Sequence, residues 1–164
     1  MSTIQIVIED QKETFQIRNI GMNDIEELRV WKNQNKKSFF YQEEISSEEQ
    51  LGWFQGYLGR QQDYMFVIEE RIDDDSTHKI GCIGFRVLDD HIVDIYNVIR
   101  GEKSVRGTRM SHVMHRLVNF IQEQFQGYKI KCDVLNDNVA REWYIKCGFS
   151  LGECFDNYSI LEWR

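Results

Sequence analysis

The stretch Arg106–Phe125, RGTRMSHVMHRLVNFIQEQF, decides the fold class of this 164-residue chain. From Met110 onward its apolar residues recur at intervals of three and four, which predicts an amphipathic helix of about five turns. The helix begins just after Gly107 and follows a segment with the alternation typical of a strand. A strand–turn–helix junction leaves several backbone N–H groups without intrahelical partners. The stretch therefore predicts a long helix packed on a sheet, with a polar turn at its start.

The segments on either side complete the prediction of a sheet with helices around it. The expected order is β-β-α-α-β-β-β-α-β-α-β-β, which gives one α+β (α/β) domain, 1–164. Its central sheet is mixed and mostly antiparallel, and about four helices flank it. The expected strands are 3–9, 14–20, 64–69, 79–88, 91–99, 129–135, 149–154 and 158–163, and the shorter helices carry 25–31, 51–58 and 140–147.

The composition excludes several classes of function. With 20 basic and 27 acidic residues the net charge is −7, which disfavours nucleic acid as a partner of the whole surface. No run approaches the roughly 18 apolar residues of a membrane span, and Met1–Gln5 lacks the pattern of a secretory signal. The 4 cysteines form no CxxC pair, so we expect reduced thiols and no metal site. These features predict a cytoplasmic protein, and a homodimer is one assembly left open.

The turn before the long helix is the strongest candidate for a binding site. A helix N-terminus carries partial positive charge and free N–H groups, so a phosphate is its natural ligand. Five basic residues and one acidic residue, Glu102, lie between positions 100 and 116, a local charge of +4. The alternative interpretation is a solvated basic loop. The five basic residues are Arg100, Lys103, Arg106, Arg109 and Arg116.

Two segments resemble the signatures of the GCN5-related N-acetyltransferase (GNAT) superfamily. Arg106–Ser111 resembles its acetyl-CoA loop, Arg/Gln-x-x-Gly-x-Gly/Ala, although Arg109 and Ser111 stand where the family usually has glycine or alanine. Ala140–Phe149 resembles its second signature, Ala-x-x-x-Tyr-x-x-x-Gly-Phe, with Asp137 at the place of the usual asparagine. The order of elements agrees from about residue 14 to residue 163.

The resemblance implies an N-acetyltransferase that uses acetyl-CoA and acts on a primary amine of a small molecule. It implies that Tyr144 is the general acid that protonates the departing thiolate. Asp94 is our candidate for the general base, and Glu69, His91 and Asp133 remain alternatives. The residues implied to bind the cofactor are Val98, Ile99, Arg100, Arg106, Gly107, Thr108, Arg109, Met110, Ser111, Asn138 and Tyr144.

The early helices and their linker are similar to those of acetyltransferases that act on amino sugars of nucleotide-activated precursors. This similarity implies substrate contacts from Trp31, Asn33, Glu43 and Trp53, together with Asp94, although the two tryptophans could equally be core residues. Two other functions stay open at this point. One is acetylation of protein or peptide N-termini, and the other is a catalytically weak CoA-binding regulatory module.

Overall fold

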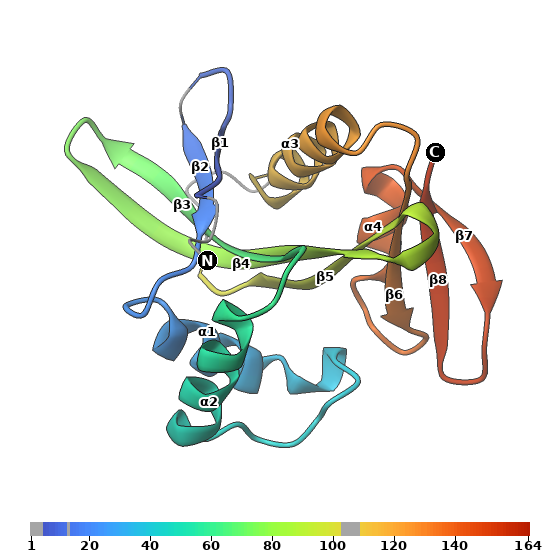
Figure 1. Cartoon of the computed structure of the whole chain (residues 1–164), viewed down its shortest axis with the longest axis horizontal. Helices are drawn as coiled ribbons and strands as arrows, with labels where there is room; N and C mark the ends of the chain where they lie inside the picture. Colours follow the sequence, from blue (N-terminus) through green and yellow to red (C-terminus); the bar gives the residue numbers. More distant parts are fainter. Residues whose placement is uncertain (1–4, 13, 103–108) are drawn as a thin grey trace.

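An eight-stranded sheet forms the centre of the protein, in a computed structural model that describes residues 5–12, 14–102 and 109–164. The strand order is β1-β2-β3-β4-β5-β6-β8-β7, and β5 and β6 are parallel while the other neighbours are antiparallel (Figure 1). The predicted α+β architecture is confirmed. The strands are β1 (Val7–Glu9), β2 (Phe15–Asn19), β3 (Asp63–Asp73), β4 (Ser76–Leu88), β5 (Ile92–Arg100), β6 (Lys129–Leu135), β7 (Phe149–Cys154) and β8 (Tyr158–Trp163).

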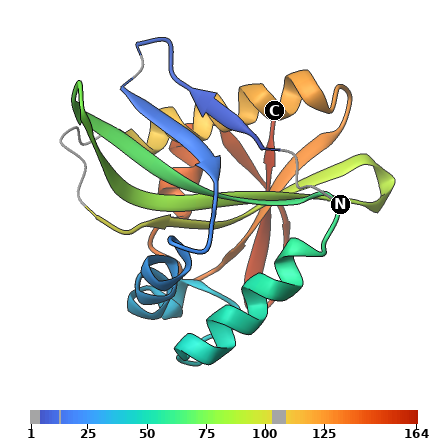
Figure 2. The same ribbon diagram turned by 60° about the vertical axis from the view of Figure 1, so that its left-hand side comes forward.

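Helices cover both faces of this sheet. The long helix α3 (Arg109–Gln124) lies on one face, and α1 (Ile25–Gln34) and α2 (Ser47–Leu58) lie on the other (Figures 1 and 2). The short helix α4 (Arg141–Cys147) packs with α3 into the same core cluster. Two single-turn 3₁₀ helices, η1 (Lys36–Ser38) and η2 (Asp89–His91), complete the described elements.

The apolar stripe predicted for the long helix holds it on the sheet. Its buried residues recur at the predicted spacing, and most of them have no exposed surface. Full burial of each such side chain stabilises the fold by roughly 1.5–3 kcal/mol before entropy costs. Because this stripe faces the same core as Tyr144 and Cys147, α3 also provides the surface on which α4 rests. The members with no exposed surface are Val113, Met114, Leu117, Val118 and Ile121.

The residues at the N-caps of α1 and α2 behave differently. Ser46 caps α2, because its Oγ accepts a hydrogen bond from the Glu49 N–H at 3.1 Å. Asp24 stands at the N-cap of α1 but makes no capping bond. Its carboxylate instead accepts from Arg18 at 2.9 Å and from Lys79 at 2.8 Å. Asp24 therefore joins α1 to β2 and β4, a tertiary role that local sequence does not reveal.

This network makes a prediction for stability against pH. Burial alone would raise the pKa of Asp24, but the hydrogen bonds from Arg18 and Lys79 outweigh it and lower the pKa from 3.8 to about 2. A carboxylate with a lowered folded pKa contributes its stability above pH 3.8 and loses it as the pH falls towards 2. We expect Asp24→Asn to reduce the free energy of unfolding at pH 7 by about 2 kcal/mol.

Urea denaturation of wild type and Asp24→Asn between pH 2 and pH 7 tests this expectation. The difference between the two proteins should shrink as the pH falls below 3.8 and become small near pH 2, where the wild-type carboxylate is itself becoming protonated. Asp74→Asn, in the exposed turn between β3 and β4, is the matched control and should change little. A constant difference at every pH would contradict the assignment to Asp24.

Candidate active site

The two parallel strands separate midway along the sheet. β5 and β6 pair only between Ile92–Asp94 and Lys129–Lys131 among the described residues. Beyond Asp94, β5 also carries a bulge, because one residue of β4 faces two of β5. Asn97 adopts a φ of 51° there, a left-handed conformation that asparagine tolerates better than most residues. The separation and the bulge leave an opening between the strands.

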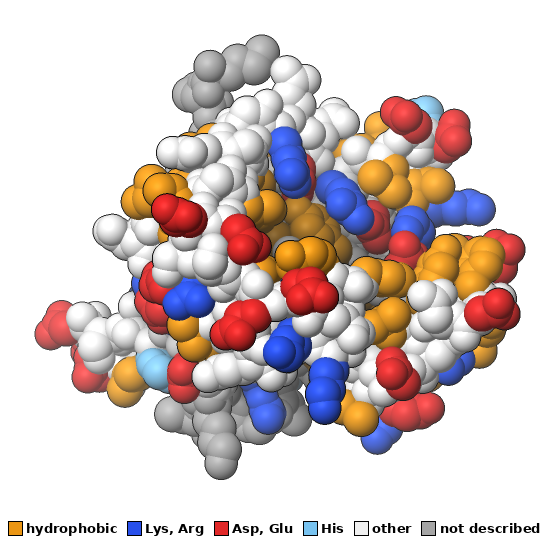
Figure 3. Space-filling model, turned by 90° about the horizontal axis from the view of Figure 1, so that it is seen from below, with side chains coloured by type: hydrophobic (Ala, Val, Ile, Leu, Met, Phe, Trp, Pro, Cys, Tyr) orange, Lys and Arg blue, Asp and Glu red, His pale blue; other side chains and the backbone are white. Residues whose placement is uncertain are grey.

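A cavity of about 320 Å³, here called the cleft cavity, fills this opening. Seen from the side of α1 and α2, the surface is hollowed, with hydrophobic side chains on its floor and charged side chains around it (Figure 3). β5, β6, α4 and the segment between α1 and α2 all contribute to its wall. The residues that line it include Phe39, Phe40, Tyr41, Trp53, Arg86, Asp94, Tyr96, Cys132, Asp133, Asn138 and Tyr144.

Tyr144 lies at the wall of the cleft cavity. Its side chain is only 6% exposed, and its ring packs edge-on against Trp143 and Phe149. Burial, and then the neighbouring Cys132 to which the hydroxyl hydrogen-bonds, raise the pKa of Tyr144 well above 10. The phenol therefore keeps its proton throughout the neutral range. A hydroxyl that keeps its proton at the cavity wall suits the general acid that the family resemblance implied.

The predicted base also reaches the cleft cavity. Asp94 is 3% exposed and accepts hydrogen bonds from Arg86 at 2.9 Å and from Lys131 at 3.3 Å. Lys131 also bonds Asp133, 2.9 Å away. Burial lowers the pKa of Lys131, but the two carboxylates outweigh this and raise it overall. The Lys131 ammonium group thus joins two carboxylates of the cavity wall, and Asp94 is also paired with Arg86.

The two other candidates for the base lie elsewhere. Glu69 accepts from Gln16 at 2.9 Å and from Arg18 at 2.7 Å, on the β2 side of the sheet. The ring of His91 packs against Tyr128 at 4.8 Å. Neither residue is part of the cavity wall, so among our candidates only Asp94 and Asp133 come together with Tyr144.

The residues expected to bind the cofactor divide into three groups. Val98 and Asn138 line the cleft cavity, and the Asn138 Oδ1 also accepts from the Ala140 N–H at the start of α4. Ile99 is buried, and Arg100 is exposed at the end of β5. Arg106, Gly107 and Thr108 lie outside the described residues.

The side chains of the first residues of α3 pack inside the protein or bond to other side chains. Met110 belongs to the core, and the Ser111 Oγ accepts from the Trp143 indole N–H at 3.1 Å. Arg109 is 3% exposed and its Nε donates to Glu70 at 2.7 Å. A second nitrogen donates to Thr14 at 2.7 Å. The Arg109 guanidinium is therefore held in the protein interior by Glu70 and Thr14, and what the start of α3 can offer a ligand is its backbone N–H groups.

The expected substrate residues are also divided. Trp53 and Asp94 line the cleft cavity. Trp31 does not: it is 2% exposed and lies so close to Gly101 that a Cβ there would meet its ring at 2.1 Å. Asn33 instead bonds both backbone groups of Ile45, at 2.8 and 2.9 Å, and so holds the linker between α1 and α2.

Glu43 is exposed and lies outside the cavity wall. Several wall residues were not predicted from the sequence, among them Lys32, Tyr41, Tyr96 and Asn97. The aromatic run Phe39–Tyr41 was a usable signal, because three consecutive aromatic side chains in a polar linker suggest a binding surface. Asn97 gave no local signal, since the bulge depends on pairing with β4.

Comparisons with known proteins agree with this geometry. A sequence model described as an acetyltransferase (GNAT) domain matches residues 15–150. No curated protein matches the chain. Among solved structures, apo FdhC, described as a nucleotide-linked sugar GNAT, is 15% identical with a TM-score of 0.76, over 98% of this chain and 90% of that one.

Two further solved structures share the fold. Spermidine N-acetyltransferase from Vibrio cholerae, in complex with CoA and spermine, is 18% identical with a TM-score of 0.74, covering 91% of this chain and 94% of that one. RimL, a ribosomal L7/L12 α-N-protein acetyltransferase in complex with CoA, is 15% identical with a TM-score of 0.77, covering 96% and 97%. Within the described residues, no helix is long and apolar enough to cross a membrane.

Proposed function

The chain belongs to the acetyltransferase (GNAT) domain family, and from this premise we propose that it acetylates a primary amine of a small molecule, with an amino sugar as the leading acceptor. It is an acetyl-CoA-dependent N-acetyltransferase. One observation carries the choice of acceptor. The wall of the cleft cavity combines aromatic side chains with two carboxylates. Rings of this kind pack on the faces of sugars, and carboxylate oxygens accept hydrogen bonds from an amine.

The separation of β5 from β6 fits the cofactor. Past Asp94 the edge of β5 that faces β6 has no strand partner in the described residues, so its backbone groups can bond an extended amide chain. Val98 lies on this edge and lines the cavity. Backbone N–H groups near Val98–Arg100 would hold the pantetheine arm and polarise the thioester carbonyl. The backbone at the start of α3 would hold the pyrophosphate.

The residues of the cleft cavity supply a general base and a general acid for the reaction. Acetyl-CoA supplies an acetyl group activated as a thioester. Asp94, with Asp133 beside it, takes the proton of the acceptor ammonium directly or through water, so that the neutral amine can attack. Tyr144 gives its proton to the departing thiolate. Because burial raises the pKa of Tyr144, this acid stays protonated at the pH where the amine must lose its proton.

A panel of amines tests the acceptor class. Amino sugars, nucleotide-activated amino sugars, spermidine and short peptides with free N-termini are each incubated with acetyl-CoA, and free CoA is measured with a thiol reagent. We expect the highest kcat/KM with an amino sugar. A higher kcat/KM for a peptide would contradict the proposal and favour the N-terminal acetyltransferase, which the net charge of −7 would suit through basic peptides. Binding of acetyl-CoA without turnover of any amine would favour the regulatory module.

A further inference from the structure

Helix α1 ends beside two neighbouring cavities. The second, here called the helix cavity, has a volume of about 270 Å³ and lies between α1, α2 and the sheet. Its wall is mostly apolar, and Leu28, Met65 and Ile99 contribute to it. Four residues line both cavities, so the two spaces adjoin each other. These shared residues are Lys32, Tyr41, Trp53 and Asn97.

Lys32 brings a positive charge to the boundary between the cavities. Its Nζ donates to the Asn97 Oδ1 at 3.2 Å and lies 5.1 Å from the centre of the Phe39 ring. Neither partner carries a negative charge. Burial lowers the pKa of Lys32, since the ammonium loses water without gaining a carboxylate. An anion bound beside Lys32 would supply the missing charge.

Four other buried or partly buried cations are paired with carboxylates. Arg18, Lys79 and Lys131 each contact two carboxylates within 4.0 Å. Arg109 contacts Glu70 at 2.7 Å. Lys32, by contrast, makes no such ion pair among the described residues, and its ammonium group bonds a neutral amide. Charges taken out of water are normally compensated, so an uncompensated ammonium at a cavity wall points to a ligand.

We propose that Lys32 binds an anionic group of the acceptor, a phosphate or a carboxylate, at the boundary of the two cavities. This inference rests on the proposed function, because it describes a second group on the molecule whose amine is acetylated. The acceptor would be an amine that carries its own negative charge, such as a phosphorylated or carboxylated amino sugar. Lys32 is then a specificity-determining residue.

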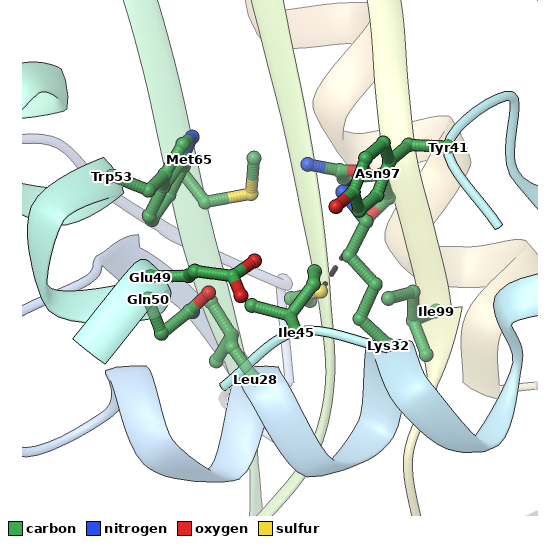
Figure 4. A pocket seen from close by; sticks show the side chains of 11 residues that line it. Leu28, Lys32, Tyr41, Ile45, Glu49, Gln50, Trp53, Met65, Asn97 and Ile99 are labelled. Carbon is green, nitrogen blue, oxygen red and sulfur yellow. Dashed lines mark hydrogen bonds between the residues drawn. The ribbon is translucent and has the colours of Figure 1, made fainter. Parts of the chain in front are cut away.

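The layout of the wall sets the spacing of the two groups. Asp94 and Asn97 are three residues apart on β5, which would be about 10 Å in a fully extended strand, and the bulge at Asn97 shortens this distance. An amine near Asp94 and an anion near Lys32 would therefore be separated by less than about 10 Å. Figure 4 shows Lys32, Asn97 and Tyr41 together on one side of the helix cavity, with Glu49 and Trp53 on the α2 side. The Glu49 carboxylate disfavours an anion there and so restricts it to the end at Lys32.

Matched amino sugars test the proposal. Glucosamine is compared with glucosamine 1-phosphate, glucosamine 6-phosphate and 2-amino-2-deoxyglucuronic acid, which carry the amine on the same carbon. We expect at least one anionic form to have a kcat/KM at least tenfold above that of glucosamine. Comparing the two sugar phosphates with the sugar carboxylate shows which of the two anionic groups the site prefers.

Two variants assign this preference to Lys32. Lys32→Met removes the charge and keeps most of the chain length, so the preference should fall at least fivefold, and Lys32→Arg should restore part of it. Lys36→Met is the matched control, because Lys36 is exposed in η1 outside both cavity walls. Thermal unfolding checks that all three variants are folded. A preference that survives in Lys32→Met, or wild type that favours none of the anionic forms, would overturn the proposal.

A binding measurement tests the anion site at Lys32 independently of acetyl transfer. The Lys32 ammonium signal is followed by NMR in ¹⁵N-lysine protein while each sugar is added in the presence of CoA. A bound anion should raise the pKa of Lys32, whereas glucosamine should leave it unchanged. If all four sugars are acetylated equally, the acetyltransferase function stands and this inference fails. If none of the sugars is acetylated, the amino-sugar function fails, and the NMR measurement then tests the Lys32 inference by itself. A change in the Lys32 pKa with sugar phosphate supports the inference. No change at 20 mM sugar phosphate overturns it.

Discussion

Replacing Tyr144 by phenylalanine is expected to lower kcat by roughly 10²–10⁴-fold, because the variant loses the general acid. The ring still fills the space between Trp143 and Phe149, so the fold should persist. The lost hydrogen bond to Cys132 should cost about 1 kcal/mol of stability at most. The acceptor with the highest rate in the amine panel is used, and kcat and the melting temperature are measured together.

A matched variant separates this effect from a general loss. Tyr128→Phe removes a hydroxyl from a ring that packs on His91 and Phe125, away from the cleft cavity. It should leave kcat within about twofold of wild type. Full activity of Tyr144→Phe would exclude Tyr144 as the acid. A parallel loss of kcat and of melting temperature in Tyr144→Phe would instead indicate a structural role.

Replacing Arg109 by methionine is expected to lower the free energy of unfolding by about 3–5 kcal/mol, since it breaks the buried ion pair with Glu70. Glu70 has no exposed surface, and Arg109 joins it and Thr14 to the first turn of α3. The pair therefore ties the start of that helix to β2 and β3. Urea denaturation at pH 7 measures the loss.

Two comparisons make this prediction specific. The double variant Arg109→Met, Glu70→Met should regain part of the stability, because apolar side chains then replace both members of the buried pair. Arg116→Met, on the same helix, is the control and should cost less than about 1 kcal/mol, since Arg116 donates to the Glu9 carbonyl at an exposed site. A loss below 1 kcal/mol in Arg109→Met would contradict the structural role. It would return the Arg109 side chain to the candidates for binding the cofactor.

The order of elements was readable from the sequence because each rests on local periodicity. The apolar stripe from Met110 to Ile121 depends on neighbours three or four residues away, and this prediction is confirmed. The strands followed from alternation bounded by polar turns. Asp24 shows the limit of this reasoning, because the choice between a cap and an ion pair depends on Lys79, distant in sequence.

The site was harder to predict, since it depends on which distant residues meet. Tyr144 and Asp94 were identified from signature and strand position, and both reach the cleft cavity. Trp31, an equally plausible substrate residue, packs against Gly101 instead. An aromatic residue on an amphipathic helix looks the same in either role, and only the neighbouring loop decides between them.

The sequence by itself determined the fold class, the family signatures and the residue types available for acetyl transfer, because these follow from short-range patterns. Only the tertiary structure decided which partner each charged side chain has and therefore what role it takes. It placed Arg109 in a buried pair with Glu70 and left Lys32 at a cavity wall beside an amide. The physical reason is that a charge in a protein interior takes its role from partners within about 4 Å, and those partners come from strands and helices far apart along the chain.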